Sequence, residues 1–281
     1  MDRRNRLELG LGTRFICYVK VMKDGIILFE DEFVNDVLNA FKGVLHIGLI
    51  QENGQIGCAR KIKIEDTVAG YSDTQMATLK AGTGDGTVNY FTKVAFFTSS
   101  QNCTINKIWL IGQGAGINED NWAVAFPAEG ISFPVGAILT VEYKGTFTGA
   151  TGGSYDVTIA DYFLFEVARA MGQDVDTGYL ACGGLHHGYH KLYYTFGGTP
   201  YNDQALASLS NAVSGSDTAD YISYYSATLL HAGRDNCTAI KVVYIPSDGV
   251  ESHALGEALD TTAGLNLDAG EPSTLEMHIT E

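Results

Sequence analysis

The chain has 281 residues, enough for one large hydrophobic core or two ordinary ones, and we expect two. Its 33 acidic and 18 basic side chains give a net charge of −15, which argues against nucleic-acid binding because a polyanion requires clustered Lys and Arg. No apolar run approaches the roughly 18 residues of a membrane span, and the segment behind MDRRNR has no secretory-signal core, so we expect neither membrane insertion nor export.

The N-terminal segment is basic and admits two interpretations. It is either a frayed terminus or an arm in which Arg3, Arg4 and Arg6 dock on an acidic neighbouring subunit through long-range attraction. Both interpretations stay open at this point.

A β-hairpin is predicted next, over residues 14–33. Asp24 and Gly25 supply the positive φ angles of a tight turn between two apolar runs. A second turn of this kind is predicted at Asp85-Gly86. Between these turns, residues 35–42 have the apolar stripe of a short helix, with Asn35 as its N-cap.

Several segments alternate with a period of two, which predicts half-buried strands. Each of three segments places a set of side chains on one face: Val88, Tyr90, Thr92, Val94 and Phe96; Leu139, Val141, Tyr143 and Phe147; and Ile222, Tyr224, Thr228 and Leu230. Helical periodicity returns only at residues 161–172. The chain is therefore expected to be mostly strand, with a few short helices.

The chain contains an internal repeat. QNCTINKIWLI (101–111) and DNCTAIKVVYI (235–245) share five of eleven positions at an offset of 134 residues. Three more blocks match in the same order at similar offsets, namely 71–80 with 201–210, 88–91 with 222–225, and 139–143 with 275–279. We interpret the four blocks as a tandem duplication. Its predicted core positions are Cys103, Ile108, Ile111, Cys237, Val242 and Ile245.

The repeat and the strand pattern together predict an all-β protein made of two tandem β-sandwich domains, immunoglobulin-like or jelly-roll. The first copy spans residues 1–148 and includes the basic arm. A small, polar linker spans 149–155, and the second copy spans 156–281.

Three motifs could hold a ligand, and for each we favour a plain loop. His186, His187 and His190 lack acidic or Cys partners at metal-ligand spacing. The GQGAG stretch (112–116) is not followed by the helix start that a phosphate cradle needs. The spacing of Asn118, Glu119 and Asp120 does not match an EF-hand loop. We therefore predict no metal and no cofactor.

No catalytic signature is present either. The G-x-S-x-G elbow of a serine nucleophile is absent, and the acidic residues offer no preferred pair. The five cysteines are Cys17, Cys58, Cys103, Cys182 and Cys237, an odd number that favours free buried thiols over disulfides. We expect the repeated pair, Cys103 and Cys237, to be buried rather than nucleophilic. No catalytic residue is predicted.

The first half resembles a module of bacteriophage virion proteins, notably tail fibres and tail-associated subunits. The residues that carry the resemblance are FVNDVLNAFKGVLHIGLI (33–50), VNYFTKVAFFTSSQNCTINKIWLIGQGA (88–115) and WAVAFPAEGISFPVGAILTVEYKGTF (122–147). The middle strand of the module corresponds to Ile105, Ile108 and Leu110. The resemblance implies a non-enzymatic structural subunit of a virion, assembled in the host cytoplasm and placed in the tail, neck, fibre or capsid surface.

The implied partners are copies of the same chain and other virion structural proteins, without nucleic acid or membrane. Residues 1–150 have a net charge of −2 and residues 151–281 one of −13, so we expect the first half to dock on the particle and the second to face solvent. One alternative is a receptor- or glycan-binding module in which Trp122, Tyr189, Tyr193 and Tyr194 stack on sugars of the host surface. A glycan-cleaving enzyme is a third.

Overall fold

The computed structural model describes most of the first half and the strands of the second. The described residues are 4–50, 57–81, 89–113, 119–151, 164, 167–168, 171–172, 189–196, 199–201, 222–230, 234–245, 253–259, 265–267 and 272–280. They form sheets whose strands are antiparallel except where β1 pairs with β19, together with helix α1 (Asn39–Ile50) and five further helical residues between 164 and 172, which confirms the all-β fold class. None of the described helical residues belongs to a helix long and apolar enough to cross a membrane.

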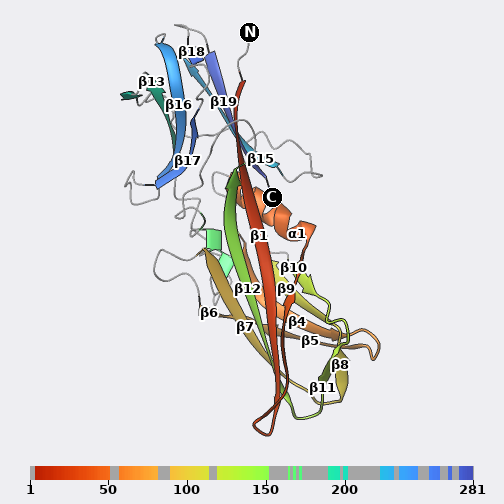
Figure 1. Cartoon of the computed structure of the whole chain (residues 1–281). Helices are drawn as coiled ribbons and strands as arrows, with labels where there is room; N and C mark the ends of the chain where they lie inside the picture. The colour runs from red at the N-terminus through yellow and green to blue at the C-terminus, as the bar shows by residue number, and fades with distance from the viewer. Residues whose placement is uncertain are drawn as a thin grey trace.

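The first half is a β-sandwich (Figure 1). Its strands are β1 (Arg4–Lys23), β2 (Ile26–Val34), β3 (Asp36–Val37), β4 (Cys58–Asp66), β5 (Tyr71–Met76), β6 (Thr78–Ala81), β7 (Tyr90–Thr98), β8 (Cys103–Ile105), β9 (Lys107–Gln113), β10 (Glu119–Ala125), β11 (Ile131–Phe133) and β12 (Ile138–Thr151). One sheet has the order β2-β1-β12-β7-β6 and faces a second with the order β3-β10-β9-β4-β5. Strands β8 and β11 form a separate pair.

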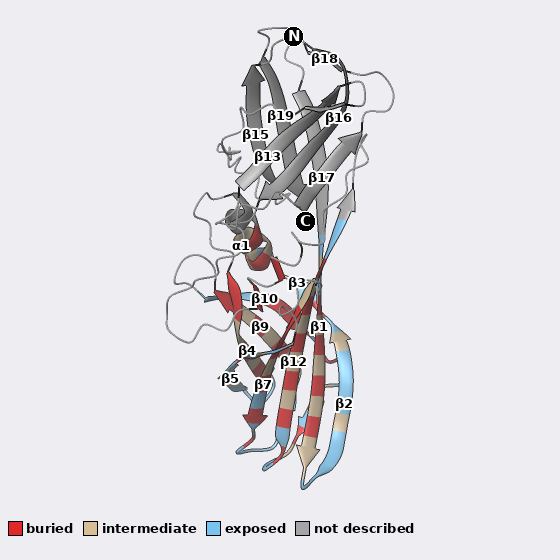
Figure 2. Ribbon diagram, turned by 90° about the vertical axis from the view of Figure 1, so that its left-hand side faces the viewer, coloured by how far each residue is buried: buried red, intermediate tan, exposed pale blue. Residues whose placement is uncertain are grey.

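The core lies between these two sheets (Figure 2). As predicted, Leu139, Val141, Tyr143 and Phe147 of β12 all point inward and are buried. The phenol of Tyr143 donates a 2.7 Å hydrogen bond to the carbonyl oxygen of Ile108 in β9, which ties one sheet to the other. A buried phenol needs such a partner, because an unpaired hydroxyl in the core costs free energy.

The inward face of β7 differs from our expectation. The buried side chains are Phe91, Thr92, Lys93, Ala95 and Phe97. Of the predicted face, Thr92 is buried, Tyr90 and Val94 are half-buried and Phe96 is exposed. Both faces of this strand are largely apolar, so alternation grouped the side chains correctly without showing which group faces the core.

The hairpin prediction is confirmed. Strands β1 and β2 are joined by Asp24 (φ 51°) and Gly25 (φ 79°), both in the left-handed region that a two-residue turn requires. The turn predicted at Asp85-Gly86 lies outside the described residues.

Helix α1 begins later than predicted, at Asn39 instead of residue 35. The Asn35 amide donates to the Phe15 carbonyl, and Asp36–Val37 pair with β10 as strand β3. Residues 35–37 therefore extend the sheet. The helical stripe at 161–172 is confirmed where it is described, because Leu164, Val167, Ala168 and Met171 are helical and buried in the same core as Phe41 of α1.

The second half contributes seven further strands: β13 (Tyr189–Phe196), β14 (Thr199–Tyr201), β15 (Ile222–Leu230), β16 (Arg234–Ile245), β17 (His253–Leu259), β18 (Leu265–Leu267) and β19 (Pro272–Thr280). Most form a sheet of the order β14-β13-β16-β17, with β18 also on β16. Strands β15 and β19 instead join the sheet of β1, so that a single sheet runs through both halves (Figure 1).

Strand β1 is the connection between the halves. Over Leu9–Met22 it pairs antiparallel with β12, and over Arg4–Gly10 it pairs parallel with β19. Residues 149–151, which we assigned to the linker, continue β12 and pair with Leu9–Leu11. These three small residues matched a linker composition, but backbone pairing with β1 decides their structure. The predicted division into two domains at 148 and 156 stays a prediction.

The strands of the two halves correspond in order. Shifted by 134 residues, β10, β11 and β12 begin at 253, 265 and 272, the first residues of β17, β18 and β19. The order β10-β9-β4-β5 has its counterpart in β17-β16-β13-β14, and β7-β12-β1 has its counterpart in β15-β19-β1. This correspondence supports the duplication.

The predicted repeat positions occupy equivalent strands. Cys103, Ile108 and Ile111 lie in β8 and β9, and Cys237, Val242 and Ile245 lie in β16. Both β9 and β16 have an antiparallel strand on each side. Cys103 and Ile108 are buried, but Ile111 is only half-buried, because three residues along a strand reverse the face. Ile111 therefore does not point into the core with Ile108 as predicted, but lies on the opposite face of β9.

Asp66 fastens the turn after β4 to strand β8. Its buried carboxylate accepts hydrogen bonds from the backbone amides of Thr104 (2.8 Å), Ala69 (2.8 Å) and Val68 (3.0 Å). These donors, the Thr104 amide first, hold the pKa of Asp66 below its ordinary value.

We expect Asp66→Asn to lower the free energy of unfolding at pH 7 by about 1.5–3 kcal/mol, because hydrogen bonds to a charged acceptor are lost. Since the folded-state pKa is the lower one, the stabilisation by Asp66 is present at neutral pH and lost as pH falls through the folded pKa. The free energies of unfolding of the wild type and of Asp66→Asn, measured with urea between pH 7 and pH 3, should therefore converge as the pH falls. Asp36→Asn, at an exposed position, is the control, and equal stability of all three proteins at pH 7 would refute the role of Asp66.

Candidate interaction surface

The outer face of the sheet β2-β1-β12-β7 has an apolar patch near the β1–β2 turn. Met22 pairs with Ile27 on one side and Ile138 on the other, so the three side chains form a row across three strands. Phe96, from β7, lies in the next outward row, opposite Thr140. We call Met22, Ile27, Ile138 and Phe96 the apolar patch.

The patch is exposed although it belongs to a regular sheet. Ile27 and Ile138 each have 49% of their surface exposed, and Phe96 has 61%. Ile26 and Leu28, at the same end of the hairpin, are also exposed, and β2 forms the edge of the sheet here (Figure 2). Adjacent exposed apolar side chains on an edge are typical of a surface that contacts another protein.

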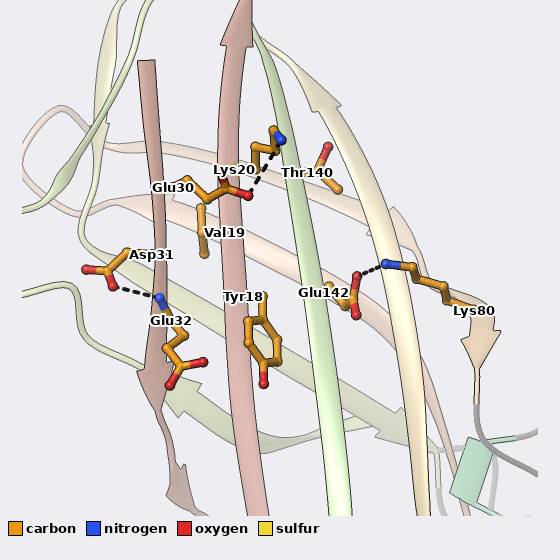
Figure 3. A pocket seen from close by; sticks show the side chains of 9 residues that line it. All are labelled: Tyr18, Val19, Lys20, Glu30, Asp31, Glu32, Lys80, Thr140 and Glu142. Atoms are coloured by element: carbon orange, nitrogen blue, oxygen red, sulfur yellow. Dashed lines mark hydrogen bonds and ion pairs between the residues drawn. The ribbon is translucent and has the colours of Figure 1, made fainter. Parts of the chain in front are cut away.

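A charged depression lies beside the patch on the same sheet. Its volume is about 520 Å³, and it is lined by Tyr18, Val19, Lys20, Glu30, Asp31, Glu32, Lys80, Thr140 and Glu142 (Figure 3). The side chains of Tyr18, Glu32 and Glu142 come from three neighbouring strands and occupy one outward row.

Ion pairs span the depression. Lys20 of β1 lies 3.5 Å from Glu30 of β2, and Lys80 of β6 pairs with Glu142 of β12 (Figure 3). Both pairs are partly exposed, so we expect each to contribute little to stability. The lining carries four carboxylates and two ammonium groups, which leaves it net acidic. An aromatic ring beside hydrogen-bonding carboxylates suits a polar ligand such as a sugar.

The N-terminal arginines lie where we did not expect them. Arg4 and Arg6 are part of β1 and pair with Thr274 and Glu276 of β19 in the same chain. The frayed-terminus interpretation is therefore wrong for residues 4–6. Docking of the arm on another subunit stays a prediction, and Arg3 lies outside the described residues.

Trp122 cannot stack on a sugar, and that prediction is wrong. Its side chain is fully buried, and its ring lies 5.4 Å from that of Phe41 in an edge-to-face arrangement. The sequence around Trp122 did not show which face of β10 is inward. Tyr189, Tyr193 and Tyr194 lie in β13, and Tyr18 is the aromatic residue that alternation alone did not single out.

The other candidate ligand motifs are only partly described. His190 lies in β13, and His186 and His187 lie outside the described residues. Gly112 and Gln113 end β9, and the rest of GQGAG is likewise outside. Glu119 pairs with Lys61 at 2.8 Å, and Asn118 lies outside the described residues. In the described part of the chain, no three His, Cys, Asp or Glu side chains are placed to hold a metal ion.

The described thiols Cys17, Cys58 and Cys103 are buried, and none of the three forms a disulfide. Burial raises the pKa of Cys17 far above its ordinary value, and it raises that of Cys103 as well. Both are therefore protonated at neutral pH, which agrees with a packing role and not with nucleophilic chemistry. Cys182 lies outside the described residues, and Cys237 lies in β16.

Comparison with known proteins found no matching family model, no matching curated protein and no matching solved structure.

Proposed function

We propose that the chain is a non-enzymatic structural subunit of a bacteriophage virion, acting through contacts with copies of itself and with other structural proteins. The observation that carries this proposal is the apolar patch, because a monomer that worked alone would gain nothing by exposing it. The resemblance of most of residues 30–148 to virion modules indicates the kind of particle. The acidic second half is suited to face solvent, since net charge keeps neighbouring particles apart.

Purified particles of the phage that encodes the chain test this proposal. We expect the chain to copurify with them at a fixed copy number through a density gradient, measured by quantitative mass spectrometry. An antibody against the chain should label one location on the particle in electron micrographs. Presence of the chain in infected cells but not in particles would contradict the proposal.

The charged depression favours one alternative, a receptor- or glycan-binding module. Tyr18 could lie against a sugar ring while Glu32 and Glu142 accept hydrogen bonds from its hydroxyls. Under this alternative the purified chain blocks adsorption of phage to the host and binds a glycan array. A passive subunit does neither.

A further inference from the structure

The N-terminal seven residues of β1 complete a sheet that belongs to the other end of the chain. Residues Arg4–Gly10 pair parallel with Thr274–Thr280 of β19, whose other edge is taken by β15. Without this segment, β19 would present a free edge nine residues long, a ready template for another strand. We call Arg4–Gly10 the clasp segment and its place beside β19 the slot.

The slot and the clasp segment match in pattern. Leu7 pairs with Met277 and Leu9 with Ile279, so apolar residues share one face. On the other face Arg6 pairs with Glu276, which places opposite charges at one register position. A slip of one residue would put Leu beside Glu, so the pattern specifies the register. The slot therefore selects this sequence, and any copy of the chain offers it.

The clasp segment is joined weakly to the rest of the fold. On the side of β1 that faces β19, no described strand pairs with residues 11–15; β2 pairs from Ile16 onward. On the β12 side, pairing begins only at Leu9. Gly10 and Gly12 lie at this junction, and glycine within a strand lowers the cost of a bend. Redirecting the segment would therefore break, within the sandwich, only the two register pairs at the end of β12, Leu9 with Thr151 and Gly10 with Ala150.

We propose that the clasp segment is exchangeable, so that in the assembled state the slot of one copy is filled by Arg4–Gly10 of a second copy. The exchange replaces each backbone hydrogen bond by an identical one. The local concentration of the chain then decides whether a segment fills the slot of its own chain or that of another copy. Because each copy donates one segment and accepts one, copies can join head to tail. This inference deepens the proposed assembly role and rests on it for the setting in a particle.

A mixing experiment on the full-length chain tests the exchange. Two differently tagged variants, Leu7→Cys and Met277→Cys, are combined at high concentration under mild oxidation, since paired positions of neighbouring strands lie within disulfide reach. We expect a disulfide-linked dimer containing both tags, verified by peptide mass spectrometry. Its yield should be at least ten times that of a control mixture of Tyr18→Cys with Glu142→Cys. Tyr18 and Glu142 are paired inside one sandwich.

The outcomes are decisive. If the double variant Leu7→Cys/Met277→Cys forms only an internal link and the mixture gives no more dimer than the control, the segment is an intramolecular clasp and the proposal fails. If neither sample links, the pairing itself is wrong and the proposal fails as well. The mixing experiment uses purified chain, so its failure would not change the result of the particle experiment. Conversely, absence of the chain from particles would not change the meaning of a mixed disulfide.

A charge exchange adds a readout that nonspecific association would not change. Arg6→Glu in the clasp donor should lower the yield of the mixed disulfide several-fold, and so should Glu276→Arg in the acceptor. Combining the two altered chains should restore the yield. Equal yields in all combinations would refute the pairing of Arg6 with Glu276 and the claim that the slot selects the clasp segment.

Discussion

Replacing Gly112 by alanine is expected to lower the free energy of unfolding by about 3 kcal/mol or more. Gly112 faces the core from β9, and a methyl group there would overlap the indole ring of Trp122 on the neighbouring strand β10. The indole cannot easily move away, because its ring packs edge-to-face on Phe41 of α1 at 5.4 Å. Phe41 in turn lies 5.1 Å from Phe15 of β1.

Urea unfolding of the purified variant measures this effect, and Gly43→Ala is the matched control. No atom lies within 4 Å of a methyl group at Gly43, and the residue is in the interior of α1. There alanine should stabilise by about 0.5–1 kcal/mol. Trp122→Ala should itself cost about 3–5 kcal/mol, and the double variant should lose less than the sum of the two. A Gly112→Ala protein as stable as the wild type would refute the close contact.

Local chemistry made part of the fold predictable. The Asp24-Gly25 turn was identified because two-residue hairpins need positive φ at both positions, and this rule depends on adjacent residues alone. The inward face of β12 was identified because only one of its faces is apolar. In β7 both faces are apolar, so the sequence grouped the side chains but did not show which set was buried.

Pairing between distant residues was not predictable in the same way. Strands β1 and β19 pair although they lie near opposite ends of the sequence. Nothing in MDRRNRLELG indicates which strand will lie beside it. For the same reason the prediction of a linker at 149–151 failed. Three small residues also suit a strand when a neighbouring strand offers backbone hydrogen bonds. The apolar patch also arises from register, because Met22, Ile27 and Ile138 become neighbours only when three strands align.

A duplication would explain why one strand serves both halves. Strands β12 and β19 are equivalent in the repeat, and they flank β1 on opposite edges while running in opposite directions. This is the arrangement that a two-fold rotation perpendicular to the sheet would produce, with β1 near the axis. On the duplication hypothesis, the last strand of each copy lies beside the same strand, β1, which belongs to the first copy.

Under the proposed assembly role, placing charge in the apolar patch is expected to weaken assembly strongly while leaving the fold intact. The double variant Ile27→Glu/Ile138→Glu changes two side chains that are each half-exposed, so the core is not disturbed. At the centre of an interface the two changes should cost about 2–4 kcal/mol together, a factor of about 30 to 1,000 in the association constant. Incorporation of the variant into particles, relative to wild type expressed in the same cells, measures this loss.

Val68→Glu is the control, because Val68 is 91% exposed on the turn after β4 and lies outside the patch. It should be incorporated like the wild type. Chains that carry the patch changes should still form the mixed disulfide when Leu7→Cys is added to one and Met277→Cys to the other, since the patch and the clasp segment lie at opposite ends of β1. Full incorporation of a folded patch variant would show that the exposed apolar row is not a contact surface.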